Sequence, residues 1–359
     1  MSGTQQRIQV AFAALVAVLG LAALPGSAAA YPPLADAQLF ELAPSVHASS
    51  VAFAPDGSLW FAGAGYAEGT TVVGRVSASG EVVEFEIPPS SRASSLFGAN
   101  AIVAGVDGAM WFTERNADAI GRIDASGQVA RYPLRHASKP DQIVAGPDGA
   151  LWFTESKSGM VGRITTTGQI TEFRLGQRSR PEGIAVGSDG AIWVAASRAN
   201  RIVRLTTGGD RTVFRLARRT EPHDIVAGPG GLWFTEGSYQ LSGTNGVNKL
   251  GRIGLDGTVK QFRVPARFGT GVIAIGPKSS AWFTTGPRLG AIESISANGE
   301  VDGRVCLNEA CTLPPSSLAF ASDGTLWFGT GVKTCVYCGG GSGLLSLQES
   351  GDVGFLRSR

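Results

Sequence analysis

The stretch Ile143-Val-Ala-Gly-Pro-Asp-Gly-Ala-Leu-Trp-Phe-Thr-Glu155 is the fullest form of a motif that returns along the whole chain. The chain has seven tryptophans, and each falls at the same place in a copy of this motif: Trp60, Trp111, Trp152, Trp193, Trp233, Trp282 and Trp327. Neighbouring tryptophans are 40 to 51 residues apart. Because a period in the forties is typical of propeller blades or solenoid turns, the sequence predicts an array of one repeated unit.

Each unit is predicted to contain four short strands. In the unit quoted above, residues 143–146 are β-formers, and Asp148-Gly149 suits a hairpin turn because glycine tolerates positive φ. Residues 151–155, 160–165 and 169–175 follow as the other three strands. No helical pattern separates the units, so we predict an all-β fold, a seven-bladed β-propeller of four-stranded antiparallel blades.

The N-terminal residues have the pattern of a secretory signal. Arg7 precedes an apolar run from Val10 to Leu24, and small residues follow at Ala28 and Ala30. We therefore predict a signal peptide over residues 1–30 and a mature propeller over 31–359, secreted or periplasmic. An uncleaved membrane anchor is the alternative. No later stretch reaches transmembrane length, so no integral membrane segment is expected after cleavage.

Composition agrees with a turn-rich β protein, because the chain has 50 glycines and only 17% charged residues. A formal net charge of +2 gives no electrostatic case for binding nucleic acid. Arginines gather on two successive connections between units, where they form either a solvated rim or an anion-binding patch: Arg174, Arg178, Arg180, Arg215, Arg218 and Arg219. We expect a monomer.

Both ends of the mature chain carry a candidate strand for closing the ring. Residues 37–42 resemble a fourth strand without the rest of its blade, and such a strand can join the last blade and remove an exposed edge. The last unit already has a candidate fourth strand at residues 352–356. One of the two would then be a fifth strand or lie outside the sheet, and the sequence leaves this open.

The last two units contain all four cysteines, Cys306, Cys311, Cys335 and Cys338. An even number in an exported protein indicates two disulfides, with three possible pairings. Local pairs, Cys306 with Cys311 and Cys335 with Cys338, are the favoured interpretation. A zinc site with four thiolate ligands is the alternative, because Cys335-Val-Tyr-Cys338 has ligand spacing.

Chemistry is expected where the repeat varies, at the residue just before the first strand of each unit. These positions hold Ser49, Asn100, Asp141, Glu182, His223, Gly271 and Ser316. Because first strands line the central channel of a propeller, the seven side chains are predicted to form a ring at one mouth. Its ionisable members, Asp141, Glu182 and His223, lie on consecutive blades, and we expect the two carboxylates to contact a substrate.

The hairpin register predicts a second ring beside the first. Strands one and two are antiparallel, so counting back from the turn places Asp141 opposite Glu155 and His223 opposite Glu236. Glu155 is thereby expected to contact substrate with Asp141. Glu221, two residues before His223, enters from the same connection. The sequence therefore predicts that Glu221, His223 and Glu236 converge at the mouth.

Two carboxylates and an imidazole placed together require a shared proton or a cation. Carboxylate oxygens with open water positions suit Mg²⁺ better than zinc. In the alternative interpretation, Glu221 and Glu236 pair with Arg180 and Lys139, and His223 only fills the ring.

The repeated Asp-Gly-x-x-Trp-Phe-Thr-Glu and Gly-Arg-Ile motifs, with Glu221-Pro-His223-Asp-Ile225, resemble the virginiamycin B lyases, also called streptogramin lyases. The resemblance covers nearly the whole mature chain. It implies a propeller that opens a cyclic depsipeptide antibiotic, such as a streptogramin B, by elimination at its ester rather than by hydrolysis, with Mg²⁺. It further implies that Glu221 and Glu236 hold the metal and that His223 transfers the proton.

Two features depart from the family pattern. Glu182 stands where that pattern has a second histidine, and an export signal is present although antibiotic-inactivating members are expected in the cytoplasm. Three hypotheses follow. The chain is a metal-dependent lyase with a role in antibiotic resistance, or a non-catalytic exported propeller that binds a peptide, glycan or protein at the mouth. The third, a calcium-dependent lactonase related to six-bladed propellers, is disfavoured by the seven tryptophans.

Overall fold

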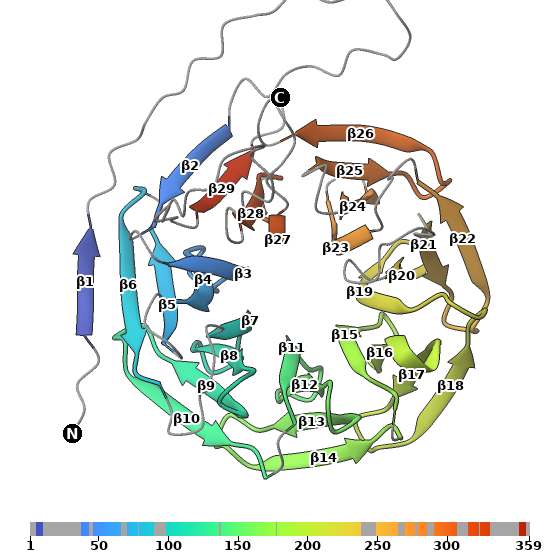
Figure 1. Ribbon diagram of the computed structural model, residues 1–359, viewed down its shortest axis with the longest axis horizontal. Coiled ribbons are helices and arrows are strands. Elements are labelled where there is room, and N and C mark those ends of the chain that lie inside the picture. The colour runs from blue at the N-terminus through green and yellow to red at the C-terminus, as the bar shows by residue number, and fades with distance from the viewer. Residues whose placement is uncertain are drawn as a thin grey trace, which may run out of the picture.

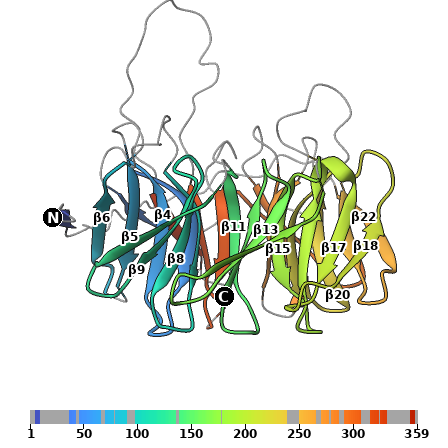
Figure 2. The same cartoon turned by 90° about the horizontal axis from the view of Figure 1, so that it is seen from below.

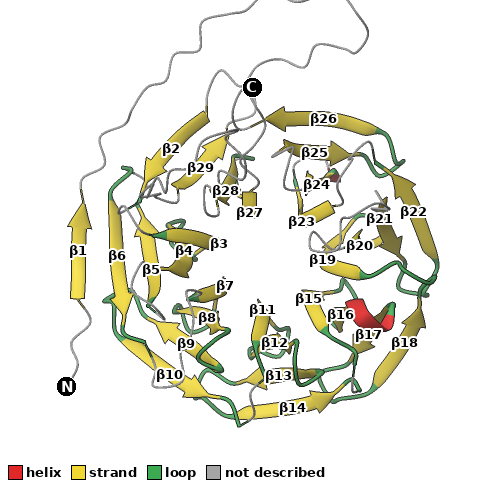
Figure 3. Ribbon diagram, in the orientation of Figure 1, coloured by secondary structure: helices red, strands yellow, loops and turns green. Residues whose placement is uncertain are grey.

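The computed structural model describes residues 5–9 and residues 37–356, except 43–45, 66–69, 78, 90–97, 136–137, 177, 238–248, 265–269, 277–278, 286–290, 307–314, 323 and 331–351. Antiparallel sheets stand around a central axis, each with its first strand innermost (Figure 1). Seen from the side, the strands run between the two faces of a disc (Figure 2). Strands account for nearly all the regular structure, and the described residues include one short 3₁₀ helix, η1 (Ser197–Ala199) (Figure 3).

We name each sheet after its innermost strand. The β3 sheet contains β3 (His47–Phe53), β4 (Leu59–Ala64), β5 (Thr71–Val76), β6 (Val82–Ile87) and, outside β6, β1 (Gln5–Gln9). The β7 blade contains β7 (Ala99–Ala104), β8 (Met110–Glu114), β9 (Ala119–Ile123) and β10 (Val129–Pro133). The β11 blade contains β11 (Pro140–Ala145), β12 (Leu151–Glu155), β13 (Met160–Ile164) and β14 (Ile170–Arg174).

The order continues in the same way around the axis. The β15 blade contains β15 (Pro181–Val186), β16 (Ile192–Ala196), β17 (Arg201–Leu205) and β18 (Arg211–Arg215). The β19 blade contains β19 (Pro222–Gly228), β20 (Gly231–Glu236), β21 (Lys249–Ile253) and β22 (Val259–Arg263). The β23 blade contains β23 (Thr270–Ile275), β24 (Ala281–Thr285), β25 (Ala291–Ile295) and β26 (Val301–Cys306).

The last sheet joins the two ends of the chain. Its order is β2-β29-β28-β27, with β27 (Pro315–Phe320), β28 (Leu326–Thr330), β29 (Asp352–Leu356) and β2 (Ala37–Glu41). Both candidate closing strands therefore belong to the sheet. The C-terminal strand β29 is third rather than fourth, and the N-terminal strand β2 pairs with it to complete the blade.

The prediction of four-stranded antiparallel blades is confirmed in part. Six sheets have four strands, and the β3 sheet has five because β1 pairs with β6. Seven four-stranded blades were expected, so this count is wrong by one. The difference arises inside the predicted signal, since β1 lies within residues 1–30 and signal cleavage would remove it.

The tryptophan of the motif anchors three consecutive blades in the same way. Trp152 is fully buried and stacks on Phe173 of the outermost strand, with ring centroids 5.2 Å apart. Its indole N–H donates to Oδ1 of Asp148 over 3.0 Å, and the other oxygen of Asp148 pairs with Arg163 over 2.6 Å. Trp111 and Trp193 make the same contacts with their own Asp-Gly turns. The repeat Asp-Gly-x-x-Trp therefore specifies one packed turn.

The glycine of the Gly-Arg-Ile motif makes room for a phenylalanine. A Cβ atom at Gly162 would lie 2.1 Å from Cζ of Phe153. Gly74, Gly121 and Gly251 are overlaid by phenylalanine in the same way. The third strand therefore needs glycine because the aromatic ring of the second strand covers its backbone.

No helix in the described part of the chain is long and apolar enough to cross a membrane.

Candidate functional site

A strained turn introduces the ring residue in three consecutive blades. Lys139, Arg180 and Glu221 each precede a proline, and their φ angles are +52°, +46° and +44°. A non-glycine residue in this left-handed region costs about 1–3 kcal/mol. The carbonyl oxygen of each accepts an N–H from the residue after its second strand, over 3.1 to 3.2 Å: Ser156, Ser197 and Gly237. These hydrogen bonds hold the turn that aims the next ring residue.

The threonine of the motif fixes the neighbouring ring position. The Thr154 hydroxyl accepts the N–H of Gln142 over 3.1 Å and donates to the carbonyl oxygen of Glu182 over 2.8 Å. Thr113 makes the equivalent contact with the carbonyl oxygen of Asp141 over 2.7 Å. Each buried threonine therefore ties its own blade to the ring residue of the next blade.

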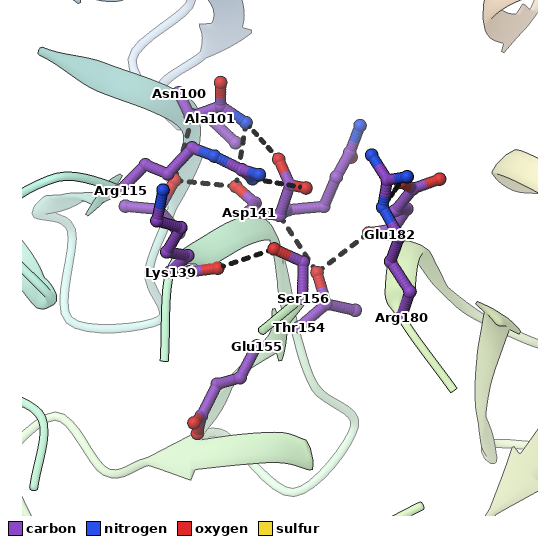
Figure 4. Close-up of polar contacts among 12 residues, drawn as sticks. Asn100, Ala101, Arg115, Lys139, Asp141, Thr154, Glu155, Ser156, Arg180 and Glu182 are labelled. Atoms are coloured by element: carbon purple, nitrogen blue, oxygen red, sulfur yellow. Dashed lines mark hydrogen bonds and ion pairs between the residues drawn. The ribbon is translucent and has the colours of Figure 1, made fainter. Parts of the chain in front are cut away.

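The Asp141 carboxylate is held by two side chains of the β7 blade (Figure 4). Arg115 Nη1 lies 2.7 Å from Oδ2, and the Asn100 amide donates a short hydrogen bond to Oδ1. Two predicted ring members, Asn100 and Asp141, are therefore in direct contact. Both oxygens of Asp141 are engaged.

Glu182 lies between two nitrogen groups. Arg180 Nε is 2.7 Å from Oε1, and His223 Nε2 is 3.6 Å from Oε2. The Glu182 side chain is only 7% exposed, and burial raises its pKa while His223 and Arg180 act in the opposite direction. The carboxylate is thus a buried acceptor beside an imidazole of the next blade.

His223 is the accessible member of this pair. Its side chain is 38% exposed, against 7% for Glu182. Imidazole is the side chain that transfers protons most readily near neutral pH, and an adjacent carboxylate both orients it and stabilises its protonated form. The arrangement can therefore accept a proton from a bound molecule and return it.

Asp224 is a functional candidate that the sequence analysis missed. It is 7% exposed, and its two oxygens accept the N–H groups of Ile225 over 2.9 Å and Ile273 over 3.0 Å. Burial raises its pKa to about 6, while the two backbone hydrogen bonds and His223 lower it. The signal was available in the sequence, because Gln142 and Gly183 occupy this place in the two preceding blades.

The register predicted for the second ring is wrong by one residue. Glu155 pairs with Pro140 rather than Asp141, and Glu236 pairs with Pro222 rather than His223. In both hairpins the register shifts between the proline and the isoleucine three residues later, which is a bulge or similar irregularity. The two glutamates therefore do not face the ring residues as expected.

The side chain of Glu236 is turned away from the mouth. It is fully buried, and both carboxylate oxygens accept from Nε2 of Gln261 on the outermost strand β22, over 2.8 and 3.0 Å. Glu155 likewise points away from Asp141 and Glu182 (Figure 4). The expected convergence of Glu221, His223 and Glu236 is therefore not found. No group of three or more metal-ligating residues is present in the described ranges.

Glu221 stays at the turn that introduces His223. Its backbone N–H donates to Oδ1 of Asn200 over 2.9 Å. The alternative pairing of Glu221 and Glu236 with Arg180 and Lys139 is not found among the described residues. Arg180 pairs with Glu182, and Glu236 is bound to Gln261. With Glu236 sealed against Gln261, the pair Glu221 and Glu236 does not fit the geometry of a shared metal ion.

The cysteine predictions fall outside the described structure. Cys306 ends strand β26, but its side chain is not among those described, and Cys311, Cys335 and Cys338 lie in undescribed segments. The two disulfides and the alternative zinc site therefore stay predictions.

Comparison with known proteins agrees with the sequence motifs. Residues 26–244, more than half of the chain, match the virginiamycin B lyase family. The chain belongs to the virginiamycin B lyase family. The sequence of this chain matches none of the curated proteins with which it was compared.

Solved structures of the family share the propeller. Virginiamycin B lyase from Staphylococcus aureus superposes with a TM-score of 0.72 at 24% identity, covering 90% of this chain and 99% of its own. A streptogramin B lyase gives 0.71 at 25% identity, covering 90% and 98%. A catalytically inactive histidine-to-alanine variant of the Staphylococcus aureus enzyme with quinupristin gives 0.73 at 25% identity, covering 90% and 99%. This virginiamycin B lyase family member therefore has the fold of these lyases over nearly their full length.

Proposed function

We propose that this virginiamycin B lyase family member is a carbon–oxygen lyase that opens an ester bond in a cyclic depsipeptide such as a streptogramin B. The observation that carries the proposal is the exposed His223 imidazole, 3.6 Å from the buried Glu182 carboxylate. The family relationship supports it, since a solved relative is described with quinupristin and is inactive after one histidine is replaced by alanine.

The proposed reaction is an elimination. His223 removes a proton from the carbon α to a carbonyl group, the C–H electron pair forms a carbon–carbon double bond, and the bond from the β carbon to the ester oxygen breaks. The ester leaves as a carboxylate, and the ring opens without addition of water. With Nε2 toward Glu182, Nδ1 of His223 is the nitrogen that accepts the proton.

Glu182 acts as a positioning residue in this proposal. Its carboxylate faces Nε2 and so stabilises the imidazolium that forms when His223 takes up a proton. Arg180 holds Glu182 in turn, and its side chain is 48% exposed, so the guanidinium can also approach negative charge that develops on a bound carbonyl.

A magnesium requirement is an expectation from the family resemblance. The residues first assigned to it do not fit, because the Glu236 carboxylate is bound to Gln261 on the outer side of the blade. We therefore derive no step through a metal ion. Comparing turnover in Mg²⁺ with turnover after chelation tests the requirement directly.

The test of function uses purified protein incubated with quinupristin, with ring opening followed by chromatography. We expect conversion by the natural chain and a loss of at least about 100-fold in His223→Ala, since general acid–base groups contribute about 10²–10⁴ in rate. Thr212→Ala, on the exposed face of β18, is the matched control and should convert normally. Equal rates in the natural chain and His223→Ala would remove the proton-transfer assignment.

A second candidate is a non-catalytic exported propeller that binds a peptide, glycan or protein at the same mouth. It is favoured by the hydrogen bonds between Glu236 and Gln261, because they keep Glu236 from joining Glu221 as a metal ligand. Calorimetric titration of quinupristin separates the two functions: heat of binding with no product after prolonged incubation supports a binding role and contradicts the lyase.

We also propose that the chain is exported through cleavage of residues 1–30 and acts as a monomer outside the cytoplasm. The small residues at Ala28 and Ala30 support this site. The N-terminal sequence of protein recovered from culture fractions should start near Tyr31. An intact Met1 on protein in the membrane fraction would support the anchor instead.

A further inference from the structure

Three blades place a buried glutamate at the end of the second strand. These residues are Glu114, Glu155 and Glu236, and none is more than 2% exposed. On each blade, a residue of the outermost strand lies across the glycine of the third strand, on the same face: Arg131, Glu172 and Gln261. The three glutamates therefore occupy equivalent positions, and the residue that faces each of them differs.

Two of the three sites compensate their buried carboxylate. Glu114 receives Arg131 Nη2 over 2.8 Å and the Thr71 hydroxyl over 3.0 Å. Glu236 receives Gln261 Nε2 on both oxygens. A buried carboxylate must be neutralised or hydrogen-bonded because isolated charge is costly in a low dielectric. Arginine and glutamine meet this need in the β7 and β19 blades.

The β11 blade has a second carboxylate where its neighbours have a donor. Glu172 faces Glu155, and the Ser158 hydroxyl donates to Oε2 of Glu155 over 2.9 Å. Burial and the nearby Glu172 charge raise the pKa of Glu155 to about 7, and Asp118 adds to this. In the described part of the chain, no lysine or arginine forms an ion pair with either glutamate.

Several buried oxygen atoms at this site lack a partner. Oε1 of Glu155, Oε1 of Glu172 and the hydroxyl of Ser138 are enclosed and make no hydrogen bond to another described residue. Glu155 and Ser138 are both 0% exposed. The Ser138 side chain is close enough to Glu155 to lower the pKa of that carboxyl. Buried oxygen atoms of Glu155, Glu172 and Ser138 therefore lie near one another, and no ion pair neutralises the two carboxylates.

We propose that Glu155, Glu172, Ser138 and Ser158 form a cation site in the β11 blade, where the connection from β10 enters it. All four supply oxygen, and two carboxylates match the charge of Ca²⁺, which prefers oxygen ligands and tolerates irregular geometry. Ser138 lies on the connection from β10 to β11, so a bound ion joins that connection to the blade. The site is separate from the mouth, since Glu155 points away from Asp141 and Glu182 (Figure 4).

The test compares calcium binding by the full chain and by two variants. Glu172→Arg places a positive charge beside Glu155, as Arg131 does beside Glu114. Glu172→Gln places an amide donor there, as Gln261 does beside Glu236. Equilibrium dialysis with radioactive Ca²⁺ should show one more bound ion in the natural chain than in either variant. The Tm of the natural chain should rise with Ca²⁺ at neutral pH, while the Tm of the variants should not.

Several outcomes would overturn the proposal. One is a calcium effect of the same size in both Glu172 variants, because the ion would then bind elsewhere. Another is a natural chain whose Tm does not change with Ca²⁺ but, in chelator, rises as the pH is lowered from about 8 to about 6. In that case a proton shared by the carboxyls of Glu155 and Glu172 would take the place of the ion. Thr171→Val, an exposed neighbour of Glu172, controls for changes on β14 and should keep the calcium response.

Discussion

Nε2 of His223 lies 3.6 Å from Oε2 of Glu182, so an exposed imidazole and a buried carboxylate meet across the boundary between the β15 and β19 blades. Both residues are fixed by contacts with their surroundings. Glu182 is fixed by Arg180 and by the Thr154 hydroxyl at its carbonyl oxygen, and His223 follows a strained turn at Glu221. The pair of His223 and Glu182 therefore forms only where two neighbouring blades meet.

Replacing Glu182 by glutamine tests this pair. Glu182→Gln keeps the shape and removes the charge that stabilises protonated His223, so turnover should fall by about 10-fold to 100-fold. The loss should fall on kcat with little change in KM, because the carboxylate acts when the proton moves rather than when the substrate binds. Asp210→Asn removes an exposed carboxylate from the same blade and should leave both quantities unchanged. An effect of Glu182→Gln confined to KM would contradict the positioning role.

The threonine bridges between blades should be important for stability. Thr154→Val keeps the volume but leaves the Gln142 N–H without its acceptor and the Glu182 carbonyl without its donor. We expect the free energy of unfolding to fall by about 1–3 kcal/mol in urea titrations. Thr171→Val, exposed on β14, should change it by less than about 0.5 kcal/mol. Equal small losses would show that the bridge contributes little.

Asp224 should make stability depend on pH. Its pKa in the folded chain is about 6, above the 3.8 of an unperturbed aspartate. The folded chain therefore binds an extra proton between about pH 4 and pH 6, and this contribution to the free energy of unfolding is lost as the pH rises through that range. Relative to Asp224→Asn, the natural chain should lose up to about 3 kcal/mol over this interval.

The measurement for Asp224 is urea unfolding of both proteins at several pH values from about 4 to about 7. Asp224→Asn should be the less stable protein at every pH, because asparagine has one oxygen for the two N–H groups of Ile225 and Ile273. A constant difference across the range would show that Asp224 does not titrate there.

Two truncations distinguish the roles of the N-terminal strands. A chain of residues 31–359 lacks β1, which pairs only with the outer edge of the β3 sheet, so its Tm should stay within a few degrees. A chain of residues 43–359 also lacks β2, which leaves β29 as an unpaired edge. It should unfold at a clearly lower Tm and aggregate more readily. Similar melting of both truncations would contradict closure through β2.

Much of the propeller could be predicted because its determinants are local. The Asp-Gly turn, the buried Trp152 and the Gly162 beneath Phe153 each act within one blade and repeat at a fixed period. The closing strands are different. Residues 37–41 and 352–356 are far apart in sequence and meet only when the ring closes, so sequence patterns identified both strands without giving their order.

The candidate site was predicted in part for a similar reason. Asp141, Glu182 and His223 were singled out by the repeat position, but the contact between Glu182 and His223 was found only in the structure. The predicted place of Glu236 was wrong, because the hairpin register shifts after Pro222 and counting from the turn assumes a regular ladder. The partner of Glu236, Gln261, lies across the third strand and could not be identified from spacing.

The mass of the product formed from quinupristin tests the central claim most directly. If His223 and Glu182 carry out an elimination, the ring-opened product has the same mass as the substrate and contains a new carbon–carbon double bond. The account predicts this product from the natural chain and none from His223→Ala. A product heavier by one water would mean hydrolysis, and unchanged quinupristin with the natural chain would contradict the proposed lyase activity.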